Sequence, residues 1–239
     1  KEKLGHYLHG FESLRGQQAK LAAMKVQLEK SAPELTDAYT SEIEVERVKA
    51  HFELAAASFV AGLTNVATIR AEHMSMRLTG LGLGNKTVHG IGHMIEGTKG
   101  GNDGQPFESG QGEFATRRVI LDFHMQQIAK LITKLDSVPE GDGSMMDNTV
   151  IVYLSDHGDR HHSKFAEWPM ITFGSAGGSL RTGRYIQLPG WGNRGNRTIA
   201  NFYLALLHAA GDQRDEFGDK DLQSPDHIDQ RGPLQEWIA

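Results

Sequence analysis

Residues 149–162 constrain the fold of this chain more than any other stretch of its sequence. They begin with Thr149–Leu154, a run rich in β-branched and aromatic side chains, and change at Ser155 to the polar sequence Ser-Asp-His-Gly-Asp-Arg-His-His. A short apolar run that ends in polar turn residues is typical of a buried strand. In open α/β sheets, ligands bind at the loops that follow the carboxyl ends of strands, so these polar residues occupy the expected position of a functional site.

The candidate ligands in the polar loop are the carboxylate of Asp156 and the imidazoles of His157, His161 and His162. Imidazole nitrogen and carboxylate oxygen are the usual non-sulfur ligands of zinc. The loop therefore predicts a divalent metal site, with zinc as the first choice and manganese, iron or calcium as alternatives. The other interpretation is a polar surface turn, in which Gly158 supplies a positive φ. The loop alone favours neither interpretation over the other.

A second pair of histidines, His89 and His93, lies within the glycine-rich residues 79–112, which predict a long loop. The spacing His-x-x-x-His occurs in metal sites, but it also arises by chance in a chain with 12 histidines. The pair supports a metal site only when it is considered together with the Asp156 loop. These residues lack the Gly-Lys-Ser/Thr ending of a phosphate-binding P-loop, so that type of site is excluded.

Hydrophobic periodicity in the rest of the chain predicts both helices and strands. The predicted helices span residues 1–30, 41–60, 113–136 and 196–210, and the predicted strands span residues 63–69, 149–154, 168–174 and 184–188. This order predicts an α/β fold with a mostly parallel sheet flanked by helices. Residues 1–239 are expected to form one domain, with a helical segment at 1–62, a sheet-and-helix core at 63–211 and a surface tail at 212–239.

Two other groups of polar residues have a structural interpretation. His124 and His208 fall within predicted helices, where a role in packing or at the surface is expected. Glu140 and Asp142 lie in a turn-rich connection that lacks the ligand register of an EF-hand. A solvated turn is therefore expected there rather than a calcium site.

Composition narrows the classes of partner. The formal net charge is −5 and the sequence pI is about 6.2, which gives no electrostatic reason to expect nucleic acid or an anionic membrane surface as a partner. No apolar run approaches the roughly 18 residues that a transmembrane helix needs, so no transmembrane segment is expected. Cysteine is absent, which excludes a disulfide framework and thiolate metal ligands.

Several segments together resemble a known family. The sequence Ser155-Asp156-His157-Gly158 after a strand resembles the second-half metal motif of the alkaline phosphatase and sulfatase superfamily. Residues 121–131, 139–149, 168–174, 177–178 and 180–184 resemble an uncharacterised family of exported bacterial proteins, a domain of unknown function placed within that superfamily. The resemblance runs from about Leu4 to about Gly218.

The resemblance implies a set of metal ligands. Asp156 and His157 correspond to a pair that binds one metal ion, and His161 or His162 to a later histidine ligand. His89 and His93 stand where the superfamily has an Asp-x-x-x-His pair for a neighbouring ion, and His89 in place of the aspartate is a departure. One or two ions are therefore expected. In two-metal sites, such ions polarise a phosphate or sulfate ester and activate a nucleophile.

The resemblance also implies a function. We expect a metal-dependent hydrolase of phosphate or sulfate esters that is exported or periplasmic. The superfamily carries its nucleophile on an early strand that has no counterpart here, so the chain is expected to be the C-terminal part of a longer protein. The missing N-terminal half or another protein chain is the expected partner, and an oligomer is also compatible. The alternative is a non-catalytic exported structural or binding protein that retains the fold.

Overall fold

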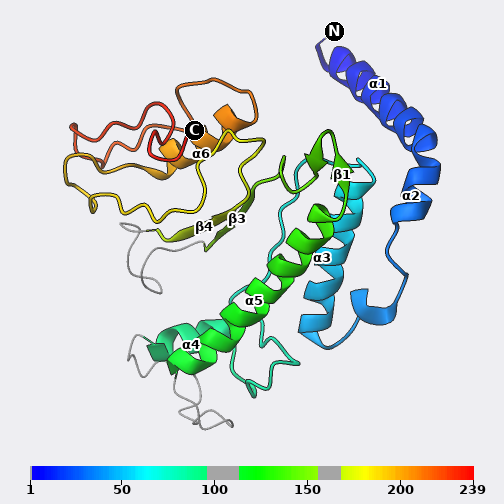
Figure 1. Ribbon diagram of the computed structural model, residues 1–239, viewed down its shortest axis with the longest axis horizontal. Coiled ribbons are helices and arrows are strands. Elements are labelled where there is room, and N and C mark those ends of the chain that lie inside the picture. Colours follow the sequence, from blue (N-terminus) through cyan, green and yellow to red (C-terminus); the bar gives the residue numbers. More distant parts are fainter. Residues whose placement is uncertain (1, 96–112, 156–167) are drawn as a thin grey trace. The chain divides into compact units, whose positions relative to one another are not determined.

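The computed structural model describes residues 2–95, 113–155 and 168–239 (Figure 1). The chain divides into two compact units, Lys1–Leu135 and Asp136–Ala239. Each unit has its own cluster of buried apolar side chains. The two units are therefore described separately. In the described parts of the chain, no helix is both long enough and apolar enough to cross a membrane.

The first unit is helical. Its elements are α1 (Glu2–Ala23), α2 (Lys25–Ser31), the 3-10 helix η1 (Asp37–Tyr39), α3 (Glu44–Val60), α4 (Val88–Ile95) and α5 (Glu113–Asp136). The predicted helices at 41–60 and 113–136 are confirmed by α3 and α5. The predicted helix at 1–30 is also confirmed, with an interruption at Met24 between α1 and α2.

The amino terminus of α3 is capped from a distant part of the chain. The backbone N–H of Glu44 donates to Thr79 Oγ1 at 2.8 Å, and the Glu44 carboxylate accepts from the backbone N–H groups of Arg77 at 2.8 Å and Thr79 at 3.3 Å. These bonds satisfy a helix N–H group that has no partner within the helix, and they place an anion where the helix dipole favours one. The capping also fixes residues 77–79 beside α3.

The core of the first unit combines helices with a segment that has no regular secondary structure. Its buried members are Val45, Val48, Met76, Leu78, Leu83, Ile91, Ile120 and Phe123. Three of them belong to residues 61–87, where the structure has no helix or strand. The strand predicted at 63–69 is therefore wrong. The Thr64 hydroxyl donates to Val66 O and accepts from Val66 N, and such local bonds compete with strand pairing.

The described residues of the second unit form short strands and one helix. The strands are β1 (Pro139–Glu140), β2 (Gly143–Ser144), β3 (Ile151–Leu154) and β4 (Met170–Phe173), and the helix is α6 (Ile199–Ala209). Strands β1 and β2 form one antiparallel pair, and β3 and β4 form another, with Ile151 opposite Phe173 and Leu154 opposite Met170. The predicted strand at 149–154 is confirmed in its last four residues and the one at 168–174 in its central four, but residues 184–188 form no strand.

The prediction of a mostly parallel sheet flanked by helices is wrong. The described residues contain only these two small antiparallel sheets. An apolar run identifies a strand but does not reveal the direction of its neighbour. The connection between β3 and β4 is long enough for a crossover, which would give a parallel pair. Instead, the chain returns and pairs β4 with β3 in the opposite direction.

The core of the second unit is closed by the C-terminal residues. The Phe202 and Trp237 rings are stacked, with centroids 4.8 Å apart and planes 5° apart. The buried Asn201 side chain donates to the carbonyls of Arg231 at 3.0 Å and Gly232 at 2.9 Å, and it accepts from the backbone N–H of Thr198 at 2.8 Å. One amide therefore caps α6 and holds the returning chain. Residues 212–239, predicted as a surface tail, also supply the buried Ile228, Leu234 and Trp237.

Candidate functional site

The six residues predicted as metal ligands fall in different parts of the chain. His89 lies in α4 of the first unit, and His93 lies one helical turn further along the same helix. Asp156, His157, His161 and His162 lie outside the described residues, as does the side chain of His93. The structure therefore describes the surroundings of this predicted site and only one of its side chains.

The His89 pair lies on a helix, although a loop was predicted there. The Thr87 hydroxyl, directly before α4, accepts from the backbone N–H of Gly90 at 3.1 Å, which is the bond of a helix N-cap. Residues four apart lie on the same side of a helix, so positions 89 and 93 share a face of α4. The His89 side chain is partly buried. This arrangement brings the two positions together, as a pair of metal ligands requires.

The residues on both sides of the Asp156 loop are held next to one another. Leu154 pairs with Met170 at the end of the β3–β4 ladder. Just beyond that pair, the indole Nε1–H of Trp168 donates to the carbonyl of Ser155 at 2.6 Å. Residues 155 and 168, the last described before the loop and the first described after it, are thus joined by a hydrogen bond. The strand predicted to precede the loop is confirmed, and it ends at Leu154.

Two other carboxylates of the second unit, Asp147 and Glu140, already have partners. Asp147 Oδ2 accepts from the backbone N–H of Ser144 at 2.8 Å and from its hydroxyl at 3.0 Å, and these bonds lower the pKa of Asp147. Glu140, in the same turn, accepts from the Asn148 side chain at 2.8 Å. Among the described residues, no group of three or more His, Asp or Glu side chains is arranged to hold a metal ion.

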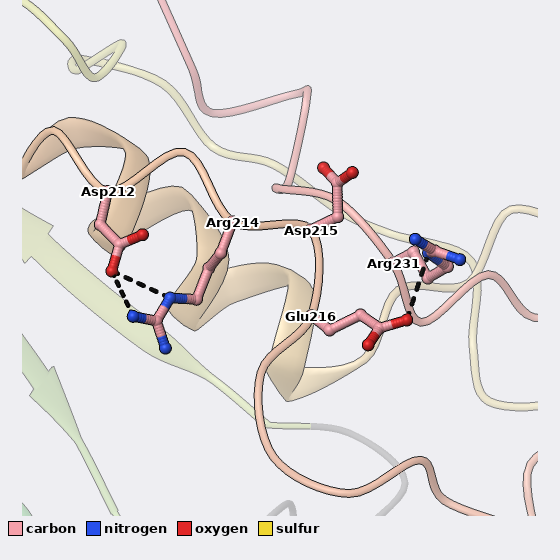
Figure 2. A pocket seen from close by; sticks show the side chains of 5 residues that line it. All are labelled: Asp212, Arg214, Asp215, Glu216 and Arg231. Carbon is pink, nitrogen blue, oxygen red and sulfur yellow. Dashed lines mark hydrogen bonds and ion pairs between the residues drawn. The ribbon is translucent and has the colours of Figure 1, made fainter.

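A shallow pocket in the second unit shows why its acidic residues do not form such a site (Figure 2). It is lined by Asp212, Arg214, Asp215, Glu216 and Arg231. The guanidinium of Arg214 donates to Asp212 Oδ2, which lowers the pKa of Asp212 and raises that of Arg214. Arg231 forms an ion pair with Glu216, with an Nε–Oε1 distance of 3.6 Å. Two of the three carboxylates are therefore neutralised by arginine, which leaves no concentrated negative charge for a cation.

The first unit contains a buried titratable group, His124 of α5. Burial lowers its pKa, the nearby Glu72 carboxylate partly opposes that shift, and Arg117 adds to it. Glu72 and Arg117 form a two-pronged ion pair, with Nη1–Oε2 and Nη2–Oε1 distances of 2.8 and 2.7 Å. This pair could not be predicted from the sequence, because Glu72 lies in the segment without regular structure.

Comparison with known proteins finds no matching family model, curated protein or solved structure.

Proposed function

We propose that this chain binds a divalent metal ion, zinc first, through Asp156, His157 and either His161 or His162. In this proposal the ion belongs to a metal-dependent hydrolase of phosphate or sulfate esters. One observation carries the proposal: the sequence Ser155-Asp156-His157-Gly158 directly follows a strand whose end is fixed. The Trp168–Ser155 hydrogen bond and the Leu154–Met170 pair support it, because a rigid frame is what positions a functional loop.

The donor set suits an anionic substrate. One carboxylate and neutral imidazoles offset only part of the charge of a divalent cation, so the metal site retains a net positive charge. A phosphate or sulfate ester would be drawn to that charge, and the ion would polarise its oxygen as a Lewis acid. His89 and His93 are proposed to bind a second ion on α4. The same proposal includes export from the cytoplasm and a partner that supplies the nucleophile.

Metal analysis of single variants tests the ligand assignment. The metal content of the dialysed protein is measured by mass spectrometry for wild type, Asp156→Asn, His157→Ala and His89→Ala. We expect each loop variant to weaken metal binding more than about tenfold, because even outer residues of metal sites contribute that much. His208→Ala is the matched control, since its ring Nε2 lies 2.8 Å from the carbonyl of Arg214, outside the proposed site. Unchanged metal content in both loop variants would disprove the assignment.

Oxyanion binding tests the proposed chemistry without requiring a nucleophile. Tungstate, a stable mimic of phosphate and sulfate, is titrated into metal-loaded and metal-free protein. We expect binding only to the metal-loaded form, and loss of that binding in His157→Ala. Metal that raises the melting temperature but binds no tungstate would replace the hydrolase proposal with that of a structural metal.

One observation favours a second candidate, a non-catalytic exported binding protein. Helix α1 exposes Leu8, Phe11 and Leu14, which are 57%, 65% and 60% accessible and spaced three residues apart. A row of exposed apolar side chains on a helix is typical of an interaction surface. Under this candidate, Phe11→Ser would abolish association with a partner while metal content and tungstate binding stay as in wild type.

A further inference from the structure

The first unit contains a groove between α3 and residues 64–76. Its volume is about 540 Å³, which is within the range of small-molecule sites. Both walls belong to the same compact unit. Among the predicted metal ligands, His89 has a described side chain, and it does not line the groove. The groove is therefore defined by residues that the proposed hydrolase function does not use.

The base of the groove is apolar. Val48 and Ala55 from α3 and Met76 from the opposite wall line it, and all three are buried. Leu54 adds a half-exposed aliphatic side chain at the edge. Because these three side chains expose little area, the hydrophobic free energy that a ligand gains comes mainly from covering Leu54, which is 46% exposed, and the partly buried Ile69. The base thus favours a ligand with a hydrocarbon or aromatic part.

The polar side chains that line the groove include four basic groups. They are Arg47 and His51 from α3 and Arg70 and His73 from the opposite wall. None of the described residues that line it is Asp or Glu. Arg47 and His51 are four residues apart, so they lie on one face of α3. The groove therefore offers positive charge from both of its walls.

Two of the three hydroxyls that line the groove already donate within the protein, so the basic groups and the Thr68 hydroxyl are the donors that remain for a ligand. The hydroxyls of Ser58 and Thr64 donate to the carbonyls of Leu54 and Val66, each at 2.8 Å. His73 Nδ1 accepts from the backbone N–H of Ser75 at 3.3 Å, so the neutral ring carries its proton on Nε2 and donates from there.

The two arginines differ in how far they are already engaged. The Arg47 guanidinium donates to the carbonyl of Ser41 and lies 4.0 Å from Glu44. Within the described part of the chain, Arg70 forms no ion pair. The Arg70 guanidinium is therefore open to pair with a ligand. Its removal should weaken ligand binding more than removal of Arg47.

We propose that this groove binds a small amphiphilic organic anion. Its carboxylate, phosphate or sulfate group pairs with Arg70 and Arg47, and its apolar part lies on the apolar base and covers Leu54. Charge excludes a cationic ligand, and the groove volume limits the occupant to a small molecule. A guanidinium binds such oxyanions well because its fork of N–H groups matches two of their oxygens.

Calorimetric titration with naphthalene-1-sulfonate tests the proposal. This probe has an anionic group and an aromatic body, and its carbon–sulfur bond is not an ester, so a hydrolase would not consume it. We expect Arg70→Gln to weaken binding about tenfold, through the loss of one charge-assisted pair. We also expect Ala67→Trp, which fills the groove from an exposed position without changing its charge, to weaken binding at least as much. Neutral 1-naphthol should bind at least about tenfold more weakly than the sulfonate.

The control is Arg118→Gln, which removes an exposed arginine of the same unit from outside the groove. It should bind the sulfonate as wild type does. The proposal is overturned if wild type does not bind the probe, if Arg70→Gln and Arg118→Gln bind equally, or if 1-naphthol binds as tightly as the sulfonate. Loss of binding in Phe11→Ser would also overturn it, because the probe would then occupy the apolar face of α1.

Discussion

The two units close their cores in the same way but hold the closing segment by different forces. In each unit, a segment without helix or strand supplies buried side chains: residues 61–87 provide Leu78 in the first, and residues 212–239 provide Trp237 in the second. The first segment adds two ion-paired or capping carboxylates to its apolar contacts. The second is held by stacked rings, by one buried amide and by one partly buried ion pair, Arg197–Glu236, with an Nη2–Oε1 distance of 3.3 Å.

The polar contacts of the first unit run through two carboxylates. The Glu44 carboxylate accepts from the backbone N–H groups of Arg77 and Thr79. The Glu72 carboxylate pairs with Arg117 of α5. In the second unit, Trp237 stacks on Phe202, and Asn201 bonds the backbone of the returning chain. This difference predicts that the first unit responds more strongly to pH and salt than the second, and that the second responds mainly to the loss of apolar volume.

The largest effect is expected from Trp237→Ala. The Trp237 side chain is 4% exposed and stacked on Phe202, so its truncation removes buried area and leaves a cavity. We expect a loss of about 3–5 kcal/mol in the free energy of unfolding. Urea denaturation measures the loss, and hydrogen exchange should place the lost protection in α6. Trp191→Ala, at a half-exposed tryptophan of the same unit, should change stability by less than about 0.5 kcal/mol. Equal losses in the free energy of unfolding for the two variants would show that the stacking of Trp237 on Phe202 does not stabilise the second unit.

A smaller effect is expected from Glu72→Gln in the first unit. The substitution keeps the side-chain size but removes the charge that pairs with the partly buried Arg117, and should cost about 1–2 kcal/mol. Asp122→Asn is the control, because its pair with Arg118 is exposed and 4.0 Å long. It should cost less than about 0.5 kcal/mol. Wild type should also lose more stability in 1 M salt than Glu72→Gln does. Equal losses in salt would contradict the claim that charged contacts hold the segment of the first unit.

The order of apolar residues along the chain predicted individual helices and strands. It failed for features that depend on contacts between residues far apart in sequence. The helix at 113–136 and the strand before Ser155 follow from the order of apolar residues alone, and both are confirmed. The direction of β4, the irregular segment that buries Leu78 and the stacking of Trp237 depend on contacts between residues far apart in sequence. No periodicity encodes such contacts.

The same distinction applies to the candidate sites. Asp156 and His157 were found from a contiguous motif, and their metal-binding role stays a prediction. The basic groove was missed because its arginines and histidines come from two segments, although the spacing of Arg47 and His51 was a detectable signal. Glu72 could not be paired with Arg117 from sequence, because nothing in the intervening residues sets their distance.

The smallest effect tests the pH response of the first unit through His124. Its pKa is lowered in the folded protein, chiefly by burial, so the unfolded chain binds a proton at a higher pH than the folded one does. His124 therefore makes its full contribution to the free energy of unfolding above the pKa of the unfolded chain, about 6.5. That contribution is lost as the pH falls from there towards the lower pKa of the folded protein. Urea denaturation at pH 8 and pH 5.5 should show wild type losing more stability than His124→Gln, which cannot take up the proton. His51→Gln, at an exposed histidine of the same unit, should lose as much as wild type. An identical loss in His124→Gln and wild type would mean that the buried ring does not control the pH response, and the contrast between the two units would then rest on the Glu72–Arg117 pair alone.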